Sequence, residues 1–381
     1  IGGQLADVDK LLKKLQHPGI ELRFCYEAGP CGFVLHRHLG KKGIHCSVVA
    51  PSLTPRKPSD LIKTDRRDAQ TLARLFRAGE LTAIHVPDEE DEAIRDLVRA
   101  RFSAVKDQRK ARQRLKGLLL RLDFRYGGKS SWTPAHLNYL ARLKMPSSAQ
   151  QLVFEEYKGA ISEATERLDR LTQAMQGQLE GWKWKPVVQA LMTLRGFQVI
   201  NAMTIIAELG DLSRFKDPTD LMGFLGLVPS EQSTGTKRHL GSITKTGNEA
   251  ARRALVEAAH HYRLPPRLSP IIQARQKGQS QAVRTIAWKA QLRLCSRYRS
   301  LSRRGKRTPI VITALARELS GFVWAIACTA MGKAPPSRNS GPGETDKAPA
   351  PERKGRVYVL RPERKYEPGP QPGDPNRKKE T

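Results

Sequence analysis

Leu22-Arg23-Phe24-Cys25-Tyr26-Glu27 is the stretch that decides the fold class, and Ile44-His45-Cys46-Ser47-Val48-Val49 is its counterpart. The first stretch alternates and is rich in aromatic side chains, and the second is a compact apolar run that stops at Pro51. Residues 33–41, between them, have a helix-like pattern. Two strands joined through a helix pair in parallel, so this region predicts a β-α-β unit.

Outside this unit, apolar residues recur at the 3.6-residue spacing of amphipathic helices. The expected helices are residues 5–15, 64–78, 89–123, 150–179, 187–194, 200–209, 249–261, 281–298 and 309–330. The long pair 89–123 and 150–179 predicts an antiparallel helix pair or a coiled coil. Residues 229–248 are polar and rich in glycine, which predicts a loop. The fold class is therefore α/β plus all-α.

These patterns divide the chain into four parts: 1–88, 89–182, 183–332 and 333–381. The last part is rich in Pro, Gly, Lys, Arg and Glu, which predicts a disordered basic tail. The turn Arg195-Gly196-Phe197 joins two predicted helices in a way that resembles a helix-hairpin-helix, which binds phosphate through turn amides. Simple packing of the two helices is the alternative.

The charge balance is strongly basic. There are 67 Lys and Arg against 37 Asp and Glu, which gives a net charge of +30 and favours a polyanionic partner, nucleic acid first. Solvated helix faces are the alternative for the arginines of residues 89–123. No apolar run of ~20 residues stands out, which disfavours a membrane protein. Five cysteines without a CxxC pair favour a reducing cytoplasm.

Three carboxylates form the first candidate site. Glu27 ends a predicted strand, and Asp65 and Asp68 lie three residues apart in the first turn of a predicted helix, on one face. Converging carboxylates require a cation, and hard oxygen ligands select Mg²⁺ or Mn²⁺. The alternative is structural: Asp65 caps the helix, Asp68 interacts with the helix dipole and Glu27 is a solvated strand end.

The sequence motifs around these acids resemble those of one protein family. Residues 26–32 (YEAGPCG), 63–69 (KTDRRDA), 226–231 (GLVPSE) and 241–248 (GSITKTGN) resemble, in the same order, the bacterial insertion-sequence transposases numbered one hundred and ten (the IS110 family). The resemblance covers about residues 1–330. It implies a RuvC-like, RNase H-like DEDD domain at 1–88, a coiled-coil segment at 89–182 and a helical transposase domain with a serine loop at 183–332.

The resemblance also implies chemistry. Four acids hold Mg²⁺, a serine attacks a DNA phosphate, and a structured bridge RNA pairs with donor and target DNA. Carried over by position, Glu27, Asp65 and Asp68 are the second, third and fourth acids. The first acid belongs on a strand upstream of residues 5–15, so we expect this chain, which begins at Ile1 and looks truncated, to be inactive as printed.

The resemblance places the nucleophile in the 229–248 loop, immediately before its first glycine. Thr234 occupies that position and Ser233 precedes it. We favour Ser233, with Thr234 as the rival, because the extra methyl group of threonine hinders in-line attack. An ordinary polar loop residue is the alternative.

Basic residues flank the same loop and are expected to contact phosphates: Lys237, Arg238, Lys245, Arg252 and Arg253. Exposed charge without a role is the alternative. His260 and His261 are adjacent on a helix, so they point about 100° apart and are expected to serve packing or phosphate contacts rather than one metal.

The sequence thus predicts a cytoplasmic, nucleoid-associated DNA transposase that acts as a dimer or tetramer with Mg²⁺ or Mn²⁺, donor and target DNA and a guide RNA, and without a membrane. Two alternatives stay open. One is a truncated remnant that binds nucleic acid without cutting it, and the other is a junction nuclease in which water attacks.

Overall fold

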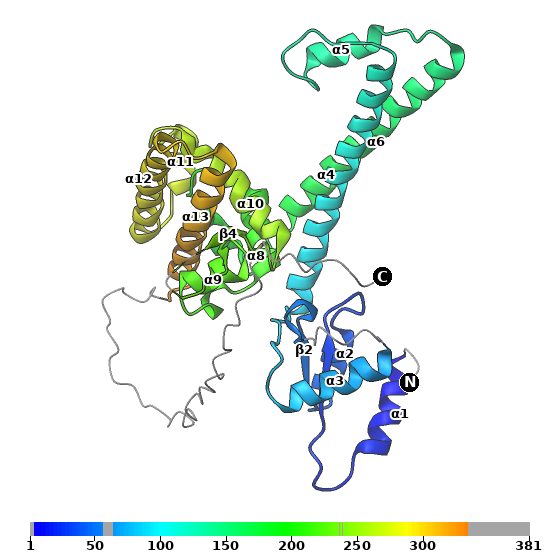
Figure 1. Ribbon diagram of the computed structural model, residues 1–381, viewed down its shortest axis with the longest axis vertical. Coiled ribbons are helices and arrows are strands. Elements are labelled where there is room, and N and C mark those ends of the chain that lie inside the picture. The colour runs from blue at the N-terminus through cyan, green and yellow to red at the C-terminus, as the bar shows by residue number, and fades with distance from the viewer. Residues whose placement is uncertain (1–3, 56–63, 236, 238, 334–381) are drawn as a thin grey trace, which may run out of the picture. The chain divides into compact units, whose positions relative to one another are not determined.

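A computed structural model describes residues 4–55, 64–235, 237 and 239–333, and within these ranges the chain is mostly helical (Figure 1). The α-helices are α1 (Leu5–Leu15), α2 (Val34–Lys41), α3 (Asp65–Arg77), α4 (Glu89–Arg121), α5 (Pro134–Arg142), α6 (Ser148–Gly177), α7 (Lys185–Leu191), α8 (Val199–Leu209), α9 (Pro218–Phe224), α10 (Glu249–Ala259), α11 (Pro270–Gln276), α12 (Gln281–Arg303) and α13 (Thr308–Ala330). The strands are β1 (Arg23–Glu27), β2 (His45–Val49), β3 (Pro229–Glu231) and β4 (Leu240–Ile243). Short 3₁₀ turns are η1 (Pro51–Leu53), η2 (Leu212–Arg214) and η3 (His260–Arg263).

The predicted β-α-β unit is confirmed. Strands β1 and β2 pair in parallel, with Phe24 opposite Cys46 and Glu27 opposite Val49, and α2 connects them. Helices α1 and α2 supply Leu12 and Leu39 to a small core that also contains Cys46. This core is thin, because β1 has no fully buried residue while β2 has three.

Helix α3 begins where the sequence predicts it, but its cap differs from the structural alternative considered for Asp65. The Thr64 hydroxyl accepts a hydrogen bond from the backbone N–H of Arg67, so threonine is the capping residue. Asp65 and Asp68 both lie in the first turn, as predicted. The idea that Asp65 caps the helix is therefore wrong.

The two long helices lie side by side as an antiparallel hairpin (Figure 1). Side-chain hydrogen bonds cross between them, from Gln108 to Thr165 and from Arg101 to Thr172. Beyond the ends of α4 and α6, the unpredicted helix α5 completes a separate cluster that buries Leu115, Leu140 and Phe154. The long helices are confirmed, and the polar bonds between them show that their contact is not purely apolar.

The remaining helices share one large core, which runs through α7, α8, α10, α12 and α13. Helix α13 is 23 residues long with a mean hydropathy of 1.6, so by length and composition it passes the test for a membrane span. This corrects the expectation that no such run exists. About half of this helix is buried within the protein, where Leu315, Leu319 and Val323 belong to the shared core.

A buried carboxylate ties the start of α4 to the helical core. Asp91 accepts hydrogen bonds from the indole N–H groups of Trp182 and Trp184, at 2.9 and 3.1 Å, and pairs with Lys183 at 3.0 Å. The carboxylate thus has both an opposite charge and hydrogen-bond donors, which lowers the free-energy cost of burying it.

Apart from Lys333, the predicted tail 333–381 lies outside the described residues.

Candidate functional site

The three predicted acids stand on neighbouring elements. Glu27 is half-buried at the carboxyl end of β1, and α3, which packs beside β1, carries the exposed Asp65 and Asp68. Oxygen donors of this kind suit Mg²⁺. However, no three His, Cys, Asp or Glu side chains of the described chain gather closely enough to hold a metal ion. The donor chemistry fits the expected metal, and the arrangement of the side chains in this structure does not form the site.

The predicted nucleophiles lie on a small hairpin rather than on a plain loop. Strands β3 and β4 pair antiparallel, with Pro229 opposite Ile243 and a register shift before Glu231. At the far end, Thr234 and Lys237 exchange two backbone hydrogen bonds of 3.2 Å each. The sequence predicts only a polar loop here, and the structure differs in that two short strands form within it and pair with each other.

Ser233 is exposed beside that turn and has an acid within reach. Its Oγ donates a hydrogen bond of 2.7 Å to Oε1 of Glu231. A hydroxyl next to a carboxylate is the arrangement in which a base can take the proton from a nucleophile. Sequence reasoning missed Glu231 as a functional candidate. The signal was its place two residues before Ser233, since alternate residues of a strand share a face.

The base of the hairpin is locked to the helical core. A Cβ on Gly247, whose φ is +70°, would lie 1.9 Å from the carbonyl oxygen of Phe224, so only glycine allows this approach. One guanidinium nitrogen of Arg252 donates to the carbonyls of Leu225 and Thr246, at 3.0 and 2.9 Å. These bonds close the loop at its two ends.

A buried acid holds the end of the loop. The Glu208 side chain is 2% exposed, receives two hydrogen bonds of 2.9 Å from Arg99 of α4 and accepts another from the amide of Asn248. Asn248 in turn caps α10 by accepting from the backbone N–H of Ala251. The hairpin therefore rises from a fixed base, which α4, α8 and α10 hold together.

The five predicted phosphate contacts differ in their surroundings. Lys237 and Lys245 are exposed, whereas Arg252 is engaged in closing the loop. Arg253 pairs with Glu257 at 2.7 Å and lies 5.1 Å from the centre of the Phe102 ring. Arg238 lies outside the described residues. Lys237 and Lys245 are thus the two whose side chains form no ion pair with another residue in the part of the chain that the structure describes.

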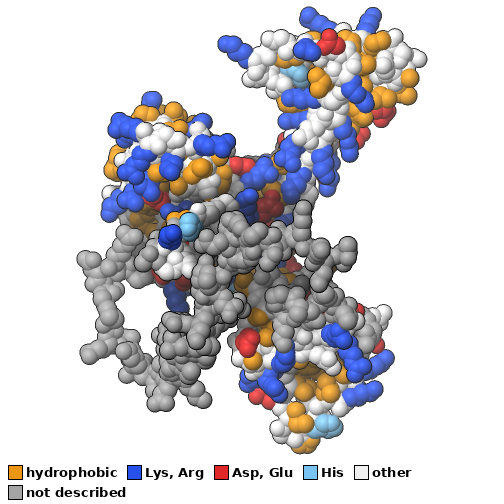
Figure 2. Space-filling view, viewed as in Figure 1, with side chains coloured by type: hydrophobic (Ala, Val, Ile, Leu, Met, Phe, Trp, Pro, Cys, Tyr) orange, Lys and Arg blue, Asp and Glu red, His pale blue; other side chains and the backbone are white. Residues whose placement is uncertain are grey.

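Basic side chains also cover much of the visible surface of the helical hairpin and of the C-terminal helices (Figure 2). His260 and His261 are both exposed and lie in η3, where they form no metal-binding group with other described residues. A basic surface of this kind favours a polyanionic partner.

Comparisons with known proteins identify the family. A sequence profile described as "Transposase IS116/IS110/IS902 family" matches residues 188–272, and a profile of IS110-type DEDD transposases, described as "Transposase", matches residues 4–123. The putative transposase y4qE of Sinorhizobium fredii is 48% identical over 324 residues, which cover 84% of this chain and 79% of the relative. The transposase for insertion sequence element IS1533 of Leptospira borgpetersenii is 33% identical over 303 residues, 79% of this chain and 88% of the relative. With both profiles in order along the chain and two relatives that span most of it, this chain belongs to the IS110 family of insertion-sequence transposases.

Proposed function

We propose that this protein is a DNA transposase that cuts and rejoins strands through a covalent link between DNA and the hydroxyl of Ser233. The hydrogen bond from Ser233 to Glu231 carries the proposal, because a hydroxyl is a weak nucleophile until a base takes its proton. Thr234 is the rival nucleophile. Its backbone is held in the turn by the bonds to Lys237.

In the proposed step, Ser233 Oγ forms a bond to the phosphorus of the scissile phosphate. Glu231 takes the hydroxyl proton, one P–O bond of the DNA backbone breaks, and the released oxygen takes up a proton. A DNA hydroxyl then attacks the phosphoserine and restores the free serine, so the rejoining consumes no external energy. The exposed Lys237 and Lys245 would neutralise neighbouring phosphates.

The acids have a separate role in the proposal. Glu27, Asp65 and Asp68 would hold Mg²⁺ or Mn²⁺, which stabilises the charge that develops on an attacked phosphate. We further propose that residues 1–88 form a RuvC-like domain, that 89–182 form a coiled-coil segment and that 183–332 form the serine-bearing domain. The +30 net charge suits donor DNA, target DNA and a guide RNA held together, and strand exchange requires at least two copies of the chain.

The test is an adduct trap. The chain, extended by the upstream strand that the family resemblance implies, is incubated with Mg²⁺, the RNA that flanks its element and labelled donor DNA, and the products are run on a denaturing gel with and without protease. We expect a protease-sensitive adduct that disappears with EDTA and in Ser233→Ala but survives in Thr234→Ala. The opposite pattern of variants moves the nucleophile to Thr234.

Glu231→Gln tests the base separately. We expect the adduct to form at least about tenfold more slowly, in the range usual for a lost general base, while Ser233 stays in place. An adduct that forms at the wild-type rate contradicts the role of Glu231.

One observation favours a second candidate, a protein that binds nucleic acid without cutting it. Within the described chain, the acids do not gather into a metal-binding group. Tight binding of DNA or RNA without adduct and without cleavage supports this candidate and contradicts the catalytic proposal. Cleavage without any adduct favours the third candidate, a nuclease in which water attacks.

A further inference from the structure

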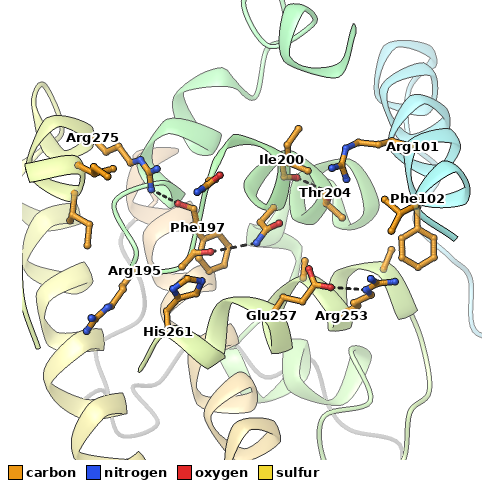
Figure 3. A pocket seen from close by; sticks show the side chains of 18 of the residues that line it. Arg101, Phe102, Arg195, Phe197, Ile200, Thr204, Arg253, Glu257, His261 and Arg275 are labelled. Atoms are coloured by element: carbon orange, nitrogen blue, oxygen red, sulfur yellow. Dashed lines mark hydrogen bonds and ion pairs between the residues drawn. The ribbon is translucent and has the colours of Figure 1, made fainter. Parts of the chain in front are cut away.

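A cavity of about 570 Å³ lies at the turn between α7 and α8 (Figure 3). The turn residues Arg195 to Gln198 and helix α8 form one side of it, and α4, α10 and α11 supply the others. Its volume lies in the range of small-molecule sites, roughly 300–1,000 Å³. The cavity therefore has room for a ligand the size of one nucleotide.

Three arginines at the cavity donate hydrogen bonds to neutral acceptors, and one of them, Arg101, is also attracted by the charge of Glu257. Arg195 donates to the carbonyls of Leu264 and Pro265, at 3.3 and 2.8 Å, and Arg275 donates to the carbonyl of Phe197 at 2.7 Å. Arg101 donates to the hydroxyl of Thr172 at 2.8 Å. These acceptors are neutral, and no carboxylate of the described chain forms an ion pair with any of the three. The positive charges of Arg195 and Arg275 thus have no carboxylate of the described chain in an ion pair, which favours an anion in the cavity.

The one carboxylate that lines the cavity is already neutralised. Glu257 accepts a hydrogen bond of 2.7 Å from Nε of Arg253, one turn earlier on α10. Figure 3 shows this pair on the side of the cavity opposite Arg195 and Arg275. The cavity as a whole therefore carries excess positive charge, with Arg195 and Arg275 on one side and Arg101 on the side of Phe102.

The start of α8 adds to this charge. Gln198, at the cap position, makes no side-chain cap, so the first backbone N–H groups of the helix have no side-chain acceptor. Gln198, Ile200 and Asn201 line the cavity. The turn is held tightly, because Gly196 has a φ of +85° and a Cβ there would lie 2.5 Å from the carbonyl of Ala258. An uncapped helix start beside three arginines favours a phosphate group.

The rest of the lining is apolar, which a phosphate alone would not require. Phe102, Val105, Ile200 and Ile271 face the same space. The Phe102 ring is partly exposed, with Lys106 4.3 Å and Arg253 5.1 Å from its centre. Nucleic-acid bases stack on such rings when they are not stacked on each other.

We propose that this cavity binds one nucleotide of a single-stranded nucleic acid. Arg195, Arg275 and the start of α8 hold its phosphate, and Phe102 and Ile271 contact its base. A base inside a duplex is paired and stacked on both sides, so only an unpaired nucleotide enters. The source of the strand, DNA or RNA, rests on the proposed function, and the chemistry of the pocket is common to both.

The test measures binding of fluorescein-labelled ten-residue strands, oligo(dT) and oligo(rU), by fluorescence anisotropy. Ile271 is 63% exposed at the rim, so Ile271→Glu adds a carboxylate against the phosphate without disturbing the core. Ile310 is the matched control: it is 56% exposed and, like Ile271, follows a proline in the first turn of a helix. We expect Ile271→Glu to weaken binding of the single strand by about tenfold or more, and Ile310→Glu by less than about twofold.

Two further measurements complete the test. An unlabelled oligo(dT)·oligo(dA) duplex is expected to compete at least about tenfold less well than the single strand. A 5-iodouracil strand is expected to crosslink, on irradiation, to the peptide that contains Phe102. Equal binding by the two glutamate variants, equal competition by the duplex, or crosslinks only outside the lining residues would each overturn the proposal.

The two proposals fail separately. If no serine adduct forms but Ile271→Glu still weakens binding of the single strand, the proposed nucleotide pocket is supported and the proposed transposition chemistry is contradicted. If Ile271→Glu binds the strand and forms the adduct like the wild type, the pocket is wrong and the proposed function stands. Tighter binding of oligo(rU) assigns the nucleotide to RNA, and tighter binding of oligo(dT) assigns it to DNA.

Discussion

Two regions of the molecule differ in how much they bury. One is the helical core that supports the Ser233 hairpin, and the other is the β-α-β unit that carries Glu27. The first buries side chains from α7, α8, α10, α12 and α13 in one continuous core. The second clusters Leu12, Leu39 and Cys46 in a much smaller core, and Val48 and Val49 of β2 are also buried. Two parallel strands alone are too few to make a stable sheet, so this unit depends on its helices.

The same difference reappears at the two halves of the candidate site. The hairpin stands on a base fixed by Gly247, Arg252 and the buried Glu208. Asp65 and Asp68 are both exposed, in the first turn of helix α3. A well-packed support fixes a nucleophile before substrate arrives, whereas thinly packed acids gain their arrangement from what binds them.

Matched leucines measure this contrast directly. Leu191 in the large core and Leu39 in the small one are both 0% exposed. We expect Leu191→Ala to lower the free energy of unfolding by about 4 kcal/mol and Leu39→Ala by about 2 kcal/mol, because a thin core relaxes around the lost volume. Urea unfolding followed by circular dichroism and by hydrogen exchange gives both values. Equal losses would remove the contrast in packing.

A pair of glycines measures how firmly the hairpin base is fixed. Gly247 and Gly305 both have a φ of +70°, but only at Gly247 would a Cβ meet another atom within 4 Å. We expect Gly247→Ala to lower the free energy of unfolding by about 3 kcal/mol, because of backbone strain and steric overlap. Gly305→Ala should lower it by about 1 kcal/mol, because of backbone strain alone. Thermal unfolding of both variants checks the difference. A cost at Gly247 no larger than at Gly305 would show that the loop base yields easily.

The elements that follow from one local pattern could be predicted from the sequence. The long helices and the parallel strands were, because the 3.6-residue spacing and the compact apolar run at 44–49 each specify one structure. Helix α5 and the β3–β4 hairpin were not. The strands of that hairpin are three and four residues long and are paired because the loop base holds their ends together, which no local pattern records.

The candidate site divides in the same way. Positions such as Asp65 and Asp68 in a first turn follow from sequence spacing, but Thr64 rather than Asp65 caps the helix, since both residue types cap well and only the backbone decides. The bond from Ser233 to Glu231 depends on the turn that brings the side chains together. The cavity at the α7–α8 turn joins four separate segments of the chain, so its lining is a tertiary property.

The smallest expected effect is a difference in the pH at which the two regions lose stability. Burial, and then the nearby Arg195, His260 and Arg263, lower the pKa of His261 below its ordinary value of 6.5. The unfolded chain then takes up more protons than the folded one as the pH falls through about 6.5, so the helical part loses stability on acidification. The hydrogen bond from His38, and then that from Lys42, lower the pKa of Asp9 below 3.8, so the β-α-β unit loses this contribution only below about pH 4.

Thermal unfolding at pH 7.5 and pH 5.5 tests this order. The free energy of unfolding falls between pH 7.5 and pH 5.5, and we expect His261→Gln to remove part of this decrease. The part is less than about 0.5 kcal/mol, because solvent reaches the ring. His17→Gln, in an exposed turn, is the control and leaves the loss unchanged. If acidification to pH 5.5 first opened the β-α-β unit, seen as faster hydrogen exchange in β1 and β2 than in α10, the thin core rather than the histidine would set the acid limit of the protein.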